Sequence, residues 1–266
     1  IDKFLSIFSI SLAELKESLK SEHQLNSKYG YAYSTLRAHP IINMKYRGEQ
    51  CFVCPLPTLL FWQITNGIYY SIYKHKKFDT SFGSSFQNYI GDVLNKALLG
   101  SKLHVLPERQ YKIGKNSKAS IDWIVSDDDS ALFIECKTKR LVFTAKSEIE
   151  DTESVNNELN IMADCIIQCY KTITHYQNGH YPHLAYNPQL KIYPIVVTLE
   201  HWYVFGDKLL TSLEKLVAKK IVELKLDTRL LETAPYTLCS VEDFEVVTQL
   251  VRIIGIRKGV RSIYVW

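Results

Sequence analysis

The order of helical and strand-like patterns between residues 86 and 254 constrains the fold of this chain more than any other feature. A helical stripe ends at Gly100, three strand-like runs and a long helical pattern follow, and a short apolar run rich in β-branched residues comes next. Such a short continuous run is expected of a strand buried on both faces. The order therefore predicts an α/β fold in which helices flank a mixed central sheet. The runs are KLHVLPERQYKI (102–113), ASIDWIV (119–125), ALFIECK (131–137) and IYPIVVTL (192–199), with helical patterns at 86–98, 155–176, 207–225 and 241–254.

Residues 1–78 show a different pattern and are expected to form a mostly helical N-terminal extension to a domain at 79–266. Apolar residues in 5–19 recur at helical steps, which indicates an amphipathic helix. The apolar stretch 56–73 is too short and too rich in Tyr to span a bilayer, so it is expected to be a buried helix or, alternatively, a docking face for a partner. The chain opens on Ile rather than Met, so it can be a fragment of a longer protein.

Composition sets the broad class of the protein. With 46% hydrophobic and 23% charged residues the chain can bury a core and is not disordered. It shows neither a membrane-spanning apolar run nor the pattern of a signal peptide, and six Cys do not make a disulfide scaffold, so a cytoplasmic protein is expected. The net charge of +4 allows a nucleic-acid partner, but only through a local basic patch.

Three side chains that can carry chemistry, Asp122, Glu135 and Lys137, lie in two of the strand-like runs. Because strand side chains alternate between faces, Glu135 and Lys137 are expected to point the same way. The polar link SDDDS is expected to join the two runs as a hairpin and to bring Asp122, expected within the first strand, towards Glu135. Two carboxylates among apolar strand residues are costly to bury unless something satisfies them. A divalent cation does so, and a nearby ammonium can orient water or stabilise developing negative charge.

The pattern D-x12-E-x-K on such a hairpin, with a helix before and a helix after, resembles the PD-(D/E)xK nuclease superfamily over residues 81–200. The superfamily includes restriction endonucleases, repair nucleases and phage-defence enzymes. The resemblance implies a restriction-endonuclease-like core and a metal-dependent nuclease, with a DNA endonuclease of restriction or antiviral defence as the expected form. It also implies that Asp122 and Glu135 hold Mg²⁺ or Mn²⁺, that the backbone carbonyl of Cys136 adds a metal ligand and that Lys137 assists the nucleophile.

The motif string alone is weak, because Glu14-Leu15-Lys16 and Glu223-Leu224-Lys225 also match E-x-K. Those two matches sit in helical patterns, whereas the match at 122–137 lies on two apolar strands. The alternative for 122–137 is a buried Asp with an ordinary Glu–Lys pair at a sheet edge.

Two glutamines extend the expected site. The superfamily's opening helix often reads G-x-x-F-E, and SFGSSFQNYIGDVL (81–94) matches it except that Gln87 stands where Glu is common. An amide can still bind a metal-bound water but supplies no charge, so the departure puts tight binding of a second metal in doubt. Some branches carry a Gln in the helix after the motif, which points to Gln168, with Lys171 on the same helical face. The alternative for these residues is an ordinary solvated helix face.

A basic patch is the expected contact with nucleic acid, and DNA is favoured over RNA. The alternative for its lysines is a solvated sheet edge. A homodimer or a larger complex is expected to form through residues 1–78. The rival function is a catalytically inactive nuclease-fold module that binds nucleic acid or a partner protein, and Gln87 is the residue that favours it. The expected patch comprises Lys112, Lys115, Lys118, Lys139 and Arg140.

Overall fold

The computed structural model describes residues 1–22, 34–67, 69, 72, 75, 77–138, 152–199 and 207–261. The chain forms two compact units, one built mainly from Ile1–Asp79 and the other from Thr80–Leu141 and Thr152–Trp266. Each unit contains helices and a sheet of its own. In the described part of the chain, no helix combines the length and the apolar character needed to cross a bilayer.

In its described residues, the first unit combines short helices with a three-stranded sheet. Its elements are α1 (Asp2–Phe8), β1 (Ser9–Ser11), α2 (Leu12–Glu22), α3 (Thr35–Ala38), β2 (Ile41–Tyr46), β3 (Glu49–Val53), α4 (Pro57–Trp62) and the π-helical turn η2 (Gln63–Gly67). Strand β2 pairs in parallel with β1 and antiparallel with β3. The prediction that residues 1–78 are mostly helical did not include this sheet, although helices hold more of the described residues than strands do.

Local interactions explain the sheet and the break in the expected first helix. Strands β2 and β3 are joined by Arg47 and Gly48, whose φ values of 52° and 88° are both positive. Two-residue turns with positive φ match the twist of a β-hairpin. At the start of α2 the Glu14 amide donates to Ser11 Oγ (3.2 Å) and the Ser11 amide donates to Glu14 Oε2 (3.0 Å). This capping box begins a new helix, so the single helix expected in residues 5–19 is divided in two.

The helix expected to be buried in residues 56–73 is also different. Helix α4 begins at Pro57, a favourable first position for proline, but none of its side chains is buried. Phe61 is 65% exposed. The prediction of a buried helix is therefore wrong for α4, and most of residues 68–76 lie outside the described part.

The second unit is built on a mixed five-stranded sheet, counted over its described residues. Its strands are β4 (His104–Pro107), β7 (Trp123–Ser126), β8 (Ser130–Lys137), β9 (Lys191–Thr198) and β10 (Thr237–Ser240), and a separate hairpin is formed by β5 (Gln110–Ile113) and β6 (Asn116–Ala119). The order across the sheet is β10-β9-β8-β7-β4, with β10, β9 and β8 parallel and with β7 antiparallel to both of its neighbours. The prediction of an α/β fold with a mixed sheet flanked by helices is confirmed.

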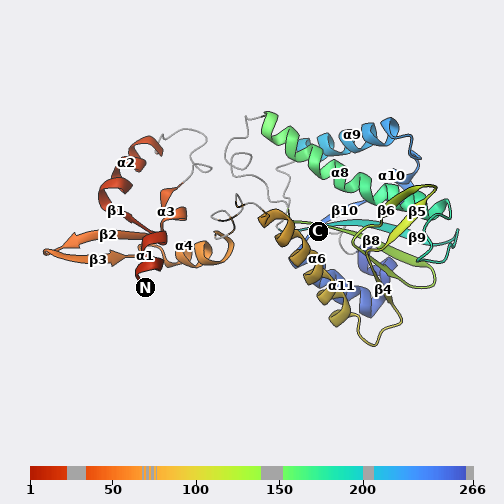
Figure 1. Ribbon diagram of the computed structural model, residues 1–266, viewed down its shortest axis with the longest axis horizontal. Helices are drawn as coiled ribbons and strands as arrows, with labels where there is room; N and C mark the ends of the chain where they lie inside the picture. Colours follow the sequence, from red (N-terminus) through yellow and green to blue (C-terminus); the bar gives the residue numbers. More distant parts are fainter. Residues whose placement is uncertain are drawn as a thin grey trace. The chain divides into compact units, whose positions relative to one another are not determined.

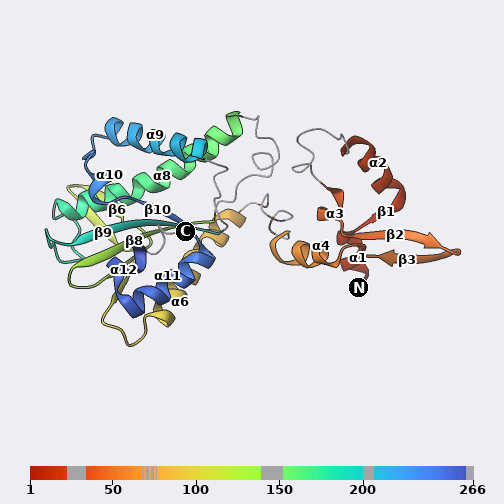
Figure 2. The same cartoon turned by 180° about the vertical axis from the view of Figure 1, so that it is seen from behind.

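Helices cover both faces of this sheet (Figures 1 and 2). The helices are α6 (Phe78–Ala97), α8 (Thr152–Gln177), α9 (Asp207–Glu223), α10 (Leu230–Thr233), α11 (Val241–Ile254) and α12 (Ile256–Arg261). Alternate residues of β8 enter two different cores. Phe133 packs with the residues of α8 and α9, whereas Leu132 and Ile134 pack with those of α6, α11 and α12. The alternation fixes which face of the sheet each polar residue of β8 occupies.

The turn between β7 and β8 confirms the predicted hairpin. Asp127 Oδ1 accepts hydrogen bonds from the backbone amides of Ser130 (2.7 Å) and Asp129 (3.1 Å). This side chain thereby satisfies the amides of the SDDDS turn, as short polar side chains commonly do. The hairpin sets the register that aligns the ends of the two strands.

Candidate active site

Two acidic residues, one within β8 and one just before β7, lie at the same level of the sheet. Trp123 is opposite Ile134 in the β7–β8 ladder, so the next pair outward is Asp122 and Glu135. Residues directly opposite each other have Cβ atoms roughly 4.5–5.5 Å apart. The register therefore brings the two predicted carboxylates together.

Asp122 lies just before β7 rather than within a strand, which corrects its expected placement between two strand residues. Its Oδ2 accepts a 2.7 Å hydrogen bond from the backbone amide of Cys136. Burial raises the pKa of Asp122, and this hydrogen bond opposes the rise. The side chain of Asp122 is thus fixed beside the end of β8.

Glu135 is a buried acid in an apolar setting. Its side chain is 1% exposed, and the thiols of Cys165 and Cys169 lie close enough for their pKa values to respond to its charge. Burial, and then the negative charge of Asp122, raises the pKa of Glu135 to about 7. Its Oε2 atom is buried without a hydrogen-bond partner. A buried carboxylate oxygen of this kind is costly, which indicates that the site accommodates a further ligand.

Lys137 pairs with Glu135 on the same face of β8, as the alternation predicts. Its Nζ lies 2.8 Å from Glu135 Oε1, and its side chain is 34% exposed. Burial has the largest single effect and disfavours the ammonium, but the nearby negative charges, that of Glu135 first, and the hydrogen bond to Glu135 together raise the pKa of Lys137. Lys137 is therefore a cation that touches the buried acid and still reaches water.

Gln87 reaches this group of acids indirectly. Its Nε2 donates to Glu108 Oε2 (3.1 Å), and its backbone oxygen accepts from Trp123 Nε1 (2.9 Å). The negative charge of Glu108 contributes to the raised pKa of both Asp122 and Glu135. Sequence reasoning missed Glu108, although it directly follows the break in the strand-like run 102–113.

Other expected site residues lie elsewhere or cannot be placed. Gln168 and Lys171 are exposed on α8, and no hydrogen bond joins the Gln168 side chain to Asp122, Glu135 or Lys137 in the described part of the chain. Their roles, like that of the Cys136 carbonyl, stay predictions. Lys139 and Arg140 lie outside the described residues.

A basic surface runs from the β5–β6 hairpin to the C-terminal half of α8. Tyr111 of β5 joins the two elements, because its hydroxyl lies 2.6 Å from His175 Nδ1. Burial lowers the pKa of His175, and positive charges lower it further. The groups responsible are His180, Lys118 and Lys171, and the two lysines define the basic surface.

The oxygen atoms available at the site determine whether it could hold a divalent cation. Across the described residues, no three or more His, Cys, Asp or Glu side chains are grouped to hold a metal by themselves. Asp122 and Glu135 provide two carboxylates, and the unpartnered Glu135 Oε2 is a ready ligand. Mg²⁺ is commonly bound by one or two carboxylates and keeps several waters. The donor set therefore fits a partly hydrated Mg²⁺ or Mn²⁺.

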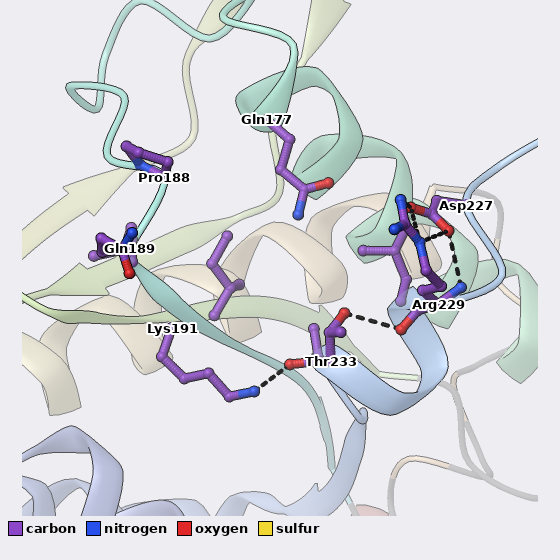
Figure 3. Close-up of a pocket in the computed structure, with 11 residues that line it drawn as sticks. Gln177, Pro188, Gln189, Lys191, Asp227, Arg229 and Thr233 are labelled. Atoms are coloured by element: carbon purple, nitrogen blue, oxygen red, sulfur yellow. Dashed lines mark hydrogen bonds and ion pairs between the residues drawn. The ribbon is translucent and has the colours of Figure 1, made fainter.

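A pocket of about 360 Å³ lies near the opposite end of the sheet (Figure 3). Lys191, which lines it, is paired with Ser130 at the start of β8, about 20 Å along the strand from Lys137. The charged groups drawn in Figure 3 are already paired, Arg229 with Asp227 (2.7 Å) and Lys191 with a backbone oxygen. The pocket thus offers less reactive chemistry than the acids at the other end.

Comparisons with known proteins add little to this geometry. No protein-family model matches the chain, and no curated protein matches it. Among solved structures, the small subunit of the heterodimeric restriction endonuclease R.BspD6I is similar with a TM-score of 0.37 and 12% sequence identity, over 68% of this chain and 77% of that chain. A TM-score this low does not establish a shared fold.

Proposed function

We propose that the protein is a metal-dependent nuclease of the PD-(D/E)xK type that hydrolyses phosphodiester bonds, with DNA as its substrate. The observation that carries the proposal is the meeting of Asp122, Glu135 and Lys137 at the end of β8. Two acids and one solvent-accessible ammonium are the residue types of the superfamily motif, and the strand register brings them together. A role in restriction or antiviral defence is proposed from the resemblance alone.

Each residue has a distinct role in this proposal. Asp122 and Glu135 would hold Mg²⁺ or Mn²⁺, which when bound lowers the pKa of water and offsets phosphate charge. Lys137 would orient the attacking water and stabilise the negative charge that develops on the phosphate. The Cys136 amide keeps the Asp122 carboxylate in place. A cation at Glu135 Oε2 would also favour the ionised form of this acid, whose burial otherwise favours the protonated form.

The basic surface supports nucleic acid as the substrate. Lys118 and Lys171 come from two elements that the contact between Tyr111 and His175 holds together. Clustered cations bind the phosphate backbone irrespective of base sequence. The β5–β6 hairpin, which carries Lys118, lies between Glu108 and Asp122 in the chain.

A cleavage assay with graded Mg²⁺ or Mn²⁺ tests the function, using plasmid, linear duplex and single-stranded DNA. We expect metal-dependent products from the wild type, and we expect Asp122→Asn and Lys137→Ala to reduce the rate by about 10²-fold or more. Lys215→Ala, which changes an exposed lysine of α9, is the matched control and should cleave normally. Full activity of Lys137→Ala would show that the catalytic assignment is wrong.

The second candidate function is a nuclease-fold module that binds DNA without cutting it. It is favoured by Gln87 in place of an acid and by the lack, in the described ranges, of a metal-holding group of three side chains. DNA binding that persists in chelator, with no products under any metal, would support this module over the enzyme.

A further inference from the structure

The β5–β6 hairpin forms a two-stranded ribbon of its own, outside the five-stranded sheet. Its inner face is anchored, because Tyr111 is buried in the same hydrophobic core as residues of α8. At its base, the Ser120 amide donates to the Arg109 carbonyl oxygen (3.0 Å), and His183 Nε2 lies 3.2 Å from the backbone oxygen of Gln110. These contacts give the outer face of the ribbon a defined position on the second unit.

The outer face of the ribbon is polar and exposed. Side chains alternate along each strand, so the residues that flank the buried Tyr111 in β5 point outward. In the antiparallel register, Gln110 lies opposite Ala119 and Lys112 lies opposite Ser117, and all four side chains are exposed. The outer face therefore carries groups that can form hydrogen bonds with a partner.

The dimensions and charge of the ribbon match the major groove of DNA. Its strands have four residues each, which extend roughly 13 Å, and the groove is about 12 Å wide and admits a two-stranded β-ribbon. The segment 109–119 has four cationic side chains and no acid, which suits the phosphates on both sides of a groove. The cations are Arg109, Lys112, Lys115 and Lys118.

Gln110 is oriented for hydrogen bonding to a base. Ser117 Oγ donates to Gln110 Oε1 (3.3 Å), and in the described part of the chain no hydrogen bond occupies Gln110 Nε2. A glutamine amide pairs with adenine in the major groove by accepting from N6 and donating to N7, and the Oε1 atom has a second lone pair for this purpose. Ala119, directly opposite, offers a methyl group of the kind that contacts the thymine methyl. The outer face thus carries the groups that distinguish an A·T pair.

We propose that the β5–β6 hairpin is the sequence-recognition element of the protein, and that its outer face enters the major groove of duplex DNA so that Gln110 pairs with an adenine. The proposal rests on the proposed function, since DNA is the polymer bound, and it extends that function from phosphate contacts to base recognition. Ser117 is a positioning residue, because it holds the Gln110 amide. Duplex RNA does not fit this role, since its major groove is too narrow for side chains to reach the bases.

Selection from a randomised duplex DNA library by the full chain in chelator tests the proposal without turnover. The wild type should enrich a motif that contains an A·T pair, and replacing that pair by G·C should weaken binding roughly 10-fold or more in fluorescence anisotropy. Gln110→Ala should bind the two duplexes equally. Gln249→Ala, which changes an exposed glutamine of α11, is the matched control and should keep the wild-type ratio of affinities.

The outcomes separate this proposal from the nuclease. If the wild type enriched no motif, or if Gln110→Ala kept the wild-type preference at every pair of the motif, the recognition role would be overturned and the nuclease would stand. A motif recognised through Gln110, with no cleavage under any metal, would support the recognition role and overturn the nuclease. No binding to any duplex would overturn both. Because Gln110 is exposed, its Ala variant should fold, and an unchanged melting temperature would confirm that the lost preference reflects the contact with the base.

Discussion

At the scale of single residues, Glu135 should make the stability of the protein depend on pH. Burial, followed by the charge of Asp122, raises its pKa to about 7, above the ordinary value of 4.5 that applies when the chain is unfolded. The contribution of Glu135 to the free energy of unfolding is therefore fully present below about pH 4.5 and is lost as the pH rises through about 7. Glu135→Gln removes this dependence. Relative to the wild type, the free energy of unfolding of the variant should rise by about 2 kcal/mol between about pH 5 and about pH 8.

Urea denaturation in metal-free buffer at a series of pH values measures this difference. The difference in unfolding free energy between variant and wild type is compared across the pH series rather than at a single pH. Any constant effect of the Gln side chain on packing then cancels. If the unfolding free energies of the wild type and the variant changed with pH in the same way, the raised pKa of Glu135 would be wrong. Added Mg²⁺ should reduce the difference at high pH if a cation binds the ionised carboxylate.

The positions of some residues of the candidate site could be predicted from the sequence, and those of others could not. Side chains alternate between the two faces along a single strand, so the sequence alone predicted that Glu135 and Lys137 point the same way. Their 2.8 Å contact confirms this. Asp122 was expected within a strand but lies one residue before it. Glu108 was missed because its place depends on the β4–β7 register, which the inserted β5–β6 hairpin hides in the sequence.

At the scale of elements, the packing of α6 on the start of β7 positions the site. A Cβ atom added to Gly91 would lie 2.2 Å from Trp123 Cζ2, a distance that forces the ring or the helix to move. Gly91→Ala should therefore destabilise the fold by about 1–3 kcal/mol in urea denaturation. Gly83→Ala is the matched control on the same helix, because nothing lies within 4 Å of its added Cβ. It should be stabilising by about 0.5–1 kcal/mol. Equal effects of the two changes would argue against the close contact.

The basic surface gives a second prediction at this scale. Lys118→Glu combined with Lys171→Glu should weaken binding to duplex DNA, and the slope of log affinity against log salt should become less steep by about 1 for each lysine that contacts a phosphate. Fluorescence anisotropy at several salt concentrations measures both quantities. Lys215→Glu with Lys219→Glu on α9 makes the same change in charge elsewhere and should have little effect. Equal losses in both double variants would mean that only net charge matters.

The elements of the second unit were predicted better than those of the first. Helices α6, α8, α9 and α11 and the β7–β8 hairpin follow long, strongly periodic stretches, which report burial directly. The short strand β10 was missed, since four residues carry little periodicity. In the first unit, the turn at Arg47 and Gly48 and the capping box at Ser11 decide the structure, and an apolar stripe in the sequence does not reveal either interaction.

At the scale of the whole molecule, the second unit contains the entire core on which its site depends. Both of its hydrophobic clusters are formed by residues between 86 and 260 of the chain. A unit with its own buried core can fold alone. A fragment of residues 78–266 should therefore unfold cooperatively in urea, with a midpoint that matches one transition of the full chain, and should bind Mn²⁺ as the full chain does. Circular dichroism and a Mn²⁺ titration measure these properties. A fragment that lacks a cooperative transition would show that the first unit helps to hold the site together, and the acids at the end of β8 would then depend on residues outside their own core.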